Sequence, residues 1–247
     1  MMSRELILDT NVVLADVFQE SSTLQSVEAM KAEARRSAVG LLITKTVKKE
    51  SVDTLGKEML SLSETLRELR DFVLGKKRGA EQDDYKVMVQ EKDLDIVQEY
   101  FRTKMYTVRK AMGRKERLRR LMEYVVAIFH AIKEERPAAE LFTEANVGIV
   151  RLDTEFTTTL ETYKRNVAPY AAREGEVRLM KRKLKIKNTK DVRILIESAQ
   201  YHTRKNPRTV FTTLDSGDIM NSAPLIETHL QLKVRDPLLA VNEVIRL

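Results

Sequence analysis

Leu6-Ile7-Leu8-Asp9-Thr10-Asn11 is the stretch that decides how this 247-residue chain is interpreted. It lies within residues 5–14, which are rich in Leu, Ile and Val and alternate little, as in a strand covered on both faces. An acid at the end of such a strand should be buried or line a cleft, where it needs a partner. Since open parallel sheets bind ligands at the carboxyl ends of their strands, Asp9 is the first candidate site residue.

The segments that follow this strand have α/β character. Helix formers with apolar residues at helical spacing occupy 23–37, and residues 41–46 read as a second short strand. The order strand, helix, strand predicts a right-handed parallel crossover. The pattern returns near the C-terminus, with a capped amphipathic helix, a strand, a short helix and an edge strand. These elements are predicted from residue 188 and at 209–214, 223–229 and 230–234.

The region between these two parts reads as helical. Amphipathic helices are predicted at 53–74, 94–112, 114–136 and after Pro137, with a weak strand candidate at 147–152. The predicted fold is therefore one α/β domain interrupted by a large all-helical insertion. Its parts are a first core half at 1–52, the insertion at 53–183 and a second core half at 184–247.

Composition narrows the classes of function. The chain has 44 Lys and Arg against 37 Asp and Glu, a net charge of +7, which favours a polyanionic partner. The absence of cysteine excludes disulfides and thiolate chemistry and fits a reducing cytoplasm, so we expect a cytoplasmic protein. The longest strongly apolar stretch, 124–132, is too short to cross a membrane, and residues 1–5 do not resemble a secretory signal.

Three further acids lie in contexts like that of Asp9. Glu50 follows the second predicted strand, Asp191 opens the later helix, and Asp215 closes the stretch TVFTTLD. Carboxylate oxygens suit hard cations such as Mg²⁺ and Mn²⁺. Because crowded carboxylates repel one another without a cation, convergence of these four acids predicts a metal site.

Each of these acids also has a simpler interpretation when taken alone. Asp191 suits a helix N-terminus through the macrodipole, and Glu50 in a charged run suits a solvated helix start. Asp215 and Asp218 flank Ser216-Gly217, which is ordinary turn chemistry. The ordered set of acids favours the metal site.

Taken together, these segments resemble the PIN-domain ribonuclease family. That family has a strand ending in Asp-x-Asn or Asp-x-Ser, a Glu after the second strand, an Asp opening a later helix, and Thr-x-Asp ending the next strand. The same elements occur here in that order, over about residues 4–52 and 185–240. The resemblance implies a PIN-like parallel sheet sandwiched by helices and metal-dependent endonucleolytic cleavage of RNA.

The resemblance also implies roles for individual residues. Asp9, Glu50, Asp191 and Asp215 would be the catalytic, metal-binding acids, with Mg²⁺ or Mn²⁺ as the cofactor. Asp218 would be an auxiliary metal-binding acid. Asn11 and Thr213 would orient the carboxylates.

Basic residues gather in two places. Residues 101–120 hold nine Lys or Arg against one acid, and a second basic cluster precedes Asp191. Solvated helix faces are the plain interpretation, but beside a nuclease site such clusters favour phosphate contact. The residues predicted to contact RNA are Arg109, Lys110, Arg114, Lys115, Arg117, Lys181, Arg182 and Lys183.

Other functions fit parts of the same pattern. A non-catalytic RNA-binding or assembly protein could use the scaffold, with its helical insertion binding a protein partner or a second copy of the chain. Ribonuclease toxins of toxin–antitoxin pairs are usually more compact. The small protein-only ribonuclease P group also has a helical insertion, but Arg193 stands where it has a further Asp. Haloacid-dehalogenase-like phosphatases need an acid where this chain has Asn11.

Overall fold

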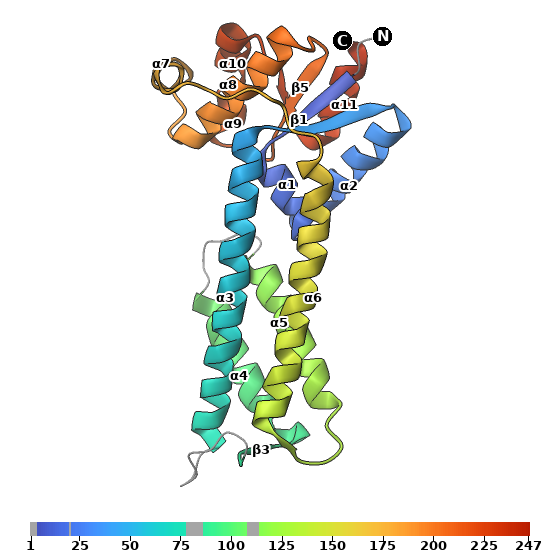
Figure 1. Cartoon of the computed structure of the whole chain (residues 1–247), viewed down its shortest axis with the longest axis vertical. Coiled ribbons are helices and arrows are strands. Elements are labelled where there is room, and N and C mark those ends of the chain that lie inside the picture. The colour runs from blue at the N-terminus through green and yellow to red at the C-terminus, as the bar shows by residue number, and fades with distance from the viewer. Residues whose placement is uncertain (1–3, 20, 78–85, 108–113) are drawn as a thin grey trace. The chain divides into compact units, whose positions relative to one another are not determined.

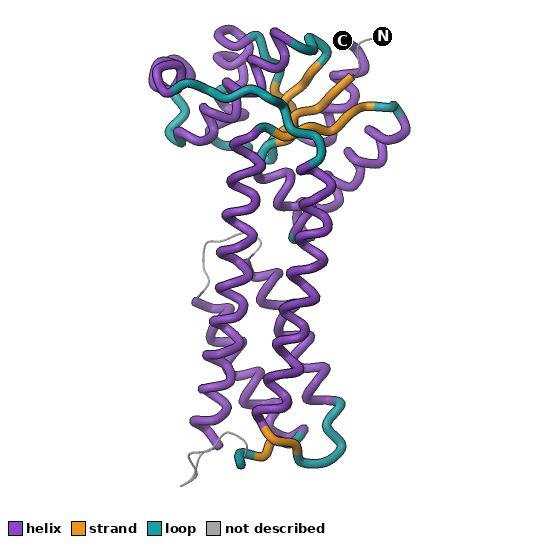
Figure 2. Tube along the Cα trace, in the orientation of Figure 1, coloured by secondary structure: helices purple, strands orange, loops and turns teal. Residues whose placement is uncertain are grey.

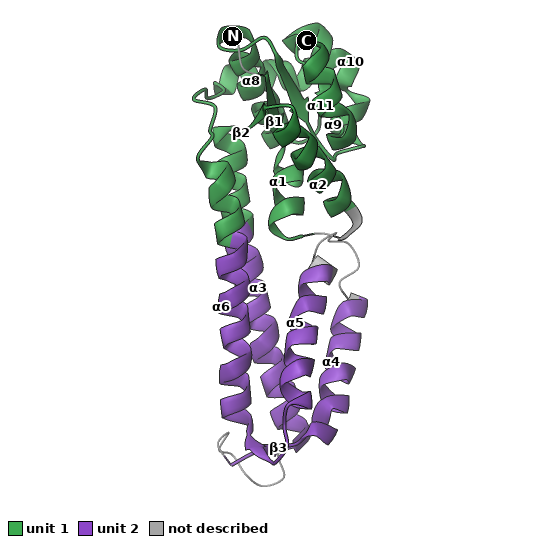
Figure 3. Ribbon diagram, turned by 90° about the vertical axis from the view of Figure 1, so that its right-hand side faces the viewer, with its two compact units in different colours: residues 1–54, 157–247 green, residues 55–156 purple. Residues whose placement is uncertain are grey.

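The computed structural model describes residues 4–19, 21–77, 86–107 and 114–247. The chain divides into two compact units (Figure 3). We call residues 1–54 and 157–247 the sheet unit, and residues 55–156 the helical unit. Within the described ranges, no helix combines the length and apolar character needed to cross a bilayer.

The sheet unit is built on four strands that pair in parallel, in the order β2-β1-β5-β6. Figure 2 draws the strands in orange among the surrounding helices. Their bounds are Arg4–Leu8 for β1, Val39–Ile43 for β2, Thr209–Thr212 for β5 and Val234–Arg235 for β6. Every residue of β5 is buried, as expected of a strand covered on both faces. The predicted α/β class with a parallel sheet is confirmed, while the more specific PIN-like fold stays a prediction.

Helices cover both faces of this sheet (Figure 1). The connection from β1 to β2 and that from β2 to β5 run in opposite directions, so right-handed crossovers place their helices on opposite faces. α2 packs on β2 and α11, and α8 packs on β5. The helices that lie wholly in this unit are α1 (Thr10–Val17), α2 (Ser21–Arg36), α7 (Glu174–Leu184), α8 (Thr189–Arg204), α9 (Asp218–Asn221), α10 (Ala223–Leu230) and α11 (Pro237–Arg246).

The direction of the connections reverses at the adjacent strands β1 and β5. Leu8, the last residue of β1, lies opposite Thr212, the last residue of β5. Open α/β sheets bind ligands outside the carboxyl ends of the strands at such a switch point. Asp9 directly follows β1, and Asp215 follows β5 by three residues, so the topology brings both acids to this edge.

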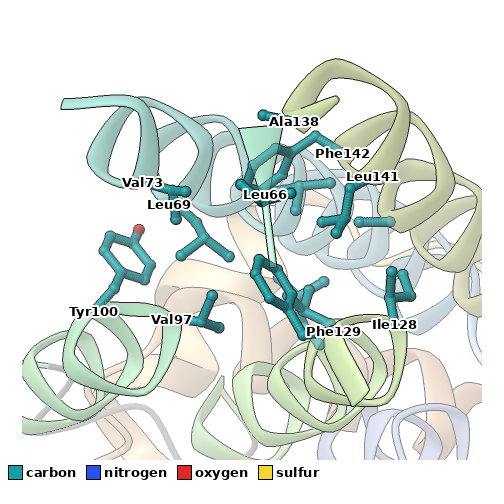
Figure 4. Close-up of a cluster of buried hydrophobic side chains, with 14 of the residues drawn as sticks. Leu66, Leu69, Val73, Val97, Tyr100, Ile128, Phe129, Ala138, Leu141 and Phe142 are labelled. Carbon is teal, nitrogen blue, oxygen red and sulfur yellow. The ribbon is translucent and has the colours of Figure 1, made fainter. Parts of the chain in front are cut away.

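The helical unit has a hydrophobic core of its own. Figure 4 shows side chains from its helices meeting there, among them Leu69, Val97 and Phe129. Gly148 lets the ring of Tyr124 pack closely, because a Cβ at this position would lie 2.2 Å from that ring. The elements of this unit are α4 (Leu94–Thr107), α5 (Arg114–His130), η1 (Glu91–Asp93) and the antiparallel pair β3 (Met88–Val89) and β4 (Arg136–Pro137). α3 (Lys45–Lys77) and α6 (Ala138–Lys164) each contribute residues to both units.

Several predicted boundaries need correction. β1 ends at Leu8, and residues 10–14 belong to α1, because Asp9 caps a helix there. β2 spans Val39–Ile43 and not 41–46, because α3 begins at Lys45; Glu50 follows that strand as predicted, from within the helix. Residues 147–152, the weak strand candidate, are helical within α6.

The insertion is also shorter than predicted. Residues 157–183 group with the sheet unit, so the separate unit spans 55–156 and not 53–183. α7 lies in this reassigned segment and was not predicted. It packs against α8 and α10, which explains why the segment belongs with the sheet.

Candidate active site

Asp9 is held by two neighbours at the end of β1. It caps α1, with its Oδ1 accepting a hydrogen bond from the Thr10 backbone N–H at 2.7 Å. Its Oδ2 accepts from the Thr213 hydroxyl at 2.7 Å. The side chain is only 4% exposed, so these bonds fix a buried carboxylate in one orientation.

Thr213 and Asn11 join Asp9 to Asp215. The Thr213 hydroxyl oxygen accepts from the Asn11 side-chain amide at 3.2 Å and from the Asp215 backbone N–H at 3.0 Å. Asn11 in turn accepts from the backbone N–H of Leu214 at 3.0 Å. Asn11 and Thr213 thus lie where side chains that orient the carboxylates were predicted.

Glu50 reaches the same region from α3. Its Oε2 accepts from the Thr10 hydroxyl at 2.8 Å, and its Oε1 accepts from the Lys190 ammonium at 3.2 Å. Thr10 follows Asp9 directly, and Lys190 precedes Asp191. Glu50 is therefore tied to both neighbouring acids through the residues beside them.

Asp191 lies in the first turn of α8, where the helix dipole favours a negative charge. Asn188 caps this helix, and its side-chain amide donates to Asp191 Oδ1 at 2.8 Å. The helix-terminus interpretation of Asp191 is thus correct as a local description. It does not account for the other acids around this carboxylate.

The pKa values of Asp9 and Asp191 show that the four carboxylates share one region. Burial and, after it, the charges of Asp9, Glu50 and Asp215 raise the pKa of Asp191 to about 7. Burial raises the pKa of Asp9 to about 6, with hydrogen bonds from Thr213 and Thr10 opposing it and the charges of Glu50 and Asp215 adding to it. Four acids from four separate segments therefore interact electrostatically.

Comparisons of the chain with protein-family models, curated proteins and solved structures found no match.

The chemistry of the donors fits Mg²⁺ or Mn²⁺, which prefer carboxylate oxygens. A cation would also favour the charged forms of Asp9 and Asp191, which their surroundings disfavour. However, among the described residues, no three Asp, Glu or His side chains are arranged so that they could hold a metal ion as they stand. Glu50 and Asp191 are instead engaged by local hydrogen-bond donors.

Asp218, the predicted auxiliary acid, opens the short helix α9 three residues after Asp215. Asp215 Oδ1 accepts from the Gly217 backbone N–H at 2.8 Å, which forms the turn between them. Within the described part of the chain, no hydrogen bond links Asp218 to the other four acids. The turn interpretation of this segment is therefore confirmed, while the role of Asp218 as an auxiliary metal-binding acid stays a prediction.

The predicted RNA contacts in the helical unit have different outcomes. Arg109 and Lys110 lie outside the described residues, and the side chains of Arg114 and Lys115 at the start of α5 are not described. The prediction for Arg117 is corrected: its side chain is 4% exposed and forms an ion pair with Glu58 at 2.9 Å. A buried, paired guanidinium does not offer its charge to a phosphate.

The second basic cluster lies in the sheet unit. Lys181, Arg182 and Lys183 form the last turn of α7, and Lys181 donates to the Thr189 hydroxyl at 2.8 Å. Thr189 begins α8, two residues before Asp191. The end of α7 therefore lies beside the start of the helix that carries one of the acids.

Thr10 and Glu197 contribute to the region although the sequence did not single them out, and Lys190 contributes although it was noted only as a member of the second basic cluster. Thr10 and Lys190 adjoin predicted acids, so a search of the flanking polar residues would have found them. Glu197 is a buried acid within the apolar face of α8, and it accepts from both the backbone N–H and the hydroxyl of Thr46. A charged residue inside an otherwise apolar run was the signal for it.

Proposed function

We propose that the protein is a Mg²⁺- or Mn²⁺-dependent endoribonuclease whose active site is formed by Asp9, Glu50, Asp191 and Asp215. The observation that carries this proposal is the electrostatic coupling of four acids, two of which, Asp9 and Asp215, follow the strands at the switch point of a parallel sheet. Holding such acids together is unfavourable for folding, and perturbed carboxylates cluster at functional sites for that reason. The resemblance to PIN-domain ribonucleases supports RNA as the substrate.

The bound cation would supply an activated water molecule and stabilise charge on the phosphate. Asp9 and Asp215 would anchor the cation, because Thr213 contacts both residues and limits their movement. Glu50 and Asp191 would position the water, which requires their side chains to turn away from their present donors. The water oxygen bonds to phosphorus as a ribose oxygen leaves, and the released proton neutralises that leaving oxygen.

The test is cleavage of total RNA by the purified protein with Mn²⁺ or with EDTA, followed by mapping of the new ends. Asp9→Asn and Asp215→Asn keep the shape of the side chain and remove its charge. We expect each to lower the cleavage rate on the order of 100-fold. Asp153→Asn, an exposed position on α6, is the control and should match the parent.

Cleavage by Asp9→Asn and Asp215→Asn at the parent rate would rule out this assignment. RNA binding without cleavage under every metal condition would instead favour the non-catalytic scaffold. Growth arrest on expression, relieved by the same substitutions, would favour the toxin interpretation.

A further inference from the structure

A cavity of about 440 Å³ lies in the sheet unit beside the candidate active site. Its cationic side chains come from the first turns of α3 and α8, and they are Lys45, Lys49, Lys190 and Arg193. Glu50 also lines it. The cavity and the acid cluster therefore share a residue.

Two of these cations are available to a ligand. Lys45 and Lys49 are one helical turn apart and exposed, and within the described part of the chain neither has a carboxylate partner. Arg193 is already engaged by Glu174 and by the backbone carbonyl of Ala172. Lys190 donates to Glu50 and links the two sites.

The acidic side chains that line the cavity do not fully neutralise the positive charge of Lys45 and Lys49. Glu197 is buried and directs both of its oxygens at Thr46, at 3.1 Å and 2.8 Å. Its charge is thus satisfied by the N-terminal turn of α3. Glu50 is engaged by Thr10 and Lys190, so Asp53 is the one remaining acid among the side chains that line the cavity.

We propose that this cavity is a phosphate subsite, which binds a backbone phosphate of the RNA strand near the phosphate held at the four acids. This inference rests on the proposed function. Lysine ammonium groups bind phosphates as point charges and supply affinity without sequence choice. A second phosphate site beside the one at the acids favours a polynucleotide over a mononucleotide.

The test measures binding of a fluorescent 12-nucleotide RNA to the full chain in EDTA, over a range of salt concentrations. Lys45→Ala/Lys49→Ala should weaken binding about tenfold and reduce the slope of log affinity against log salt by roughly 1 to 1.5. Lys48→Ala/Lys57→Ala removes the same charge from exposed positions of the same helix that do not line the cavity. It should stay within about twofold of the parent.

Equal losses in the two double variants would show general electrostatic attraction and overturn the subsite. Complete competition by millimolar inorganic phosphate or by uridine 3′,5′-bisphosphate would also overturn it, since the cavity would then be a small-anion site. Because binding is measured without cleavage, the two proposals fail separately. If Lys45→Ala/Lys49→Ala binds RNA as tightly as the parent, only the phosphate subsite is ruled out. If that variant loses binding selectively but the parent does not cleave RNA, only the nuclease proposal is ruled out.

Discussion

Thr213 shows how one buried hydroxyl can organise a charged region. It donates to Asp9 and accepts from Asn11 and from the Asp215 backbone, so its only proton is directed at a carboxylate. The network leaves Asp9 with its hydrogen bonds satisfied although its surroundings disfavour the charged form. The orientation of the Asp9 carboxylate and the cost of its negative charge are therefore separate properties of this site, and they can be tested separately.

Removing the charge of Asp191 should stabilise the metal-free protein at high pH. The pKa of Asp191 rises from 3.8 to about 7 on folding, so between these values the folded state binds more protons than the unfolded state. The contribution of Asp191 to the free energy of unfolding therefore falls as pH rises from about 4 to 7. Above pH 7 the carboxylate is charged in both states, and the full loss of stability persists. Asp191→Asn should raise the melting temperature at pH 8 in EDTA, with the difference from the parent vanishing near pH 4.

Thermal melts of both proteins across this pH range measure the effect. Mn²⁺ should raise the melting temperature of the parent at pH 8 and have a smaller effect on Asp191→Asn, because the cation offsets the cost of the buried, repelled charge that the substitution removes. A difference in melting temperature between the parent and Asp191→Asn that stays constant across this pH range would contradict the electrostatic cost assigned to the charged Asp191 carboxylate.

Some site residues could be predicted from the sequence, and the reason differs between them. Asp9 was identifiable because an acid directly after an apolar run must be buried or line a cleft, and either position requires a partner. Thr10 and Glu197 carry local signals, since one adjoins a predicted acid and the other is a charge within an apolar run. Their roles could not be predicted, because their partners lie 40 and 151 positions away along the chain. Arg117 was mistaken for a surface cation because a local cluster of basic residues does not reveal a buried partner such as Glu58.

At the scale of elements, Glu197 joins α8 to the start of α3. It binds Thr46, and Glu50 lies one turn further along α3, so Glu197 controls where Glu50 lies relative to Asp191. Glu197→Ala should weaken Mn²⁺ binding about tenfold. Glu197→Gln should recover most of the affinity, since its amide oxygen can still accept from the Thr46 N–H. Electron paramagnetic resonance of free Mn²⁺ provides the measurement.

Glu227→Ala on α10 is the matched control, because it removes an exposed carboxylate from the same unit. If Glu197 served only to stabilise the fold, both of its variants would melt at lower temperatures but would bind Mn²⁺ with the same affinity. Equal Mn²⁺ affinity in the alanine and glutamine variants would therefore exclude this positioning role.

Element boundaries were harder to predict than element types. The run Val12-Val13-Leu14 resumes the apolar character of β1 after three polar residues, so residues 5–14 resemble one strand with a polar interruption although a helix starts after Asp9. The start of α3 was also missed, because its first turns carry Lys45, Thr46, Lys48 and Lys49 instead of an apolar stripe. Capping by Thr44 and Glu197 starts the helix there, and the contact from Glu197 is tertiary.

At the scale of the whole molecule, all four candidate active-site acids belong to the sheet unit, while the helical unit has a separate core. Phe129 is fully buried in that core (Figure 4). Phe129→Ala should destabilise the helical unit by about 3–5 kcal/mol through the lost contacts and the cavity left behind. Hydrogen exchange should accelerate in residues 55–156 and change little in β1 and β5. Mn²⁺ affinity should be retained, because every candidate ligand lies in the other unit.

The same variant, Phe129→Ala, separates the roles of the two units in RNA binding. If the helical unit holds RNA, affinity for a long RNA in EDTA falls while cleavage of a short oligonucleotide persists. Loss of exchange protection in β1 and β5 together with residues 55–156 would show that the two units unfold as one, and would contradict their independence.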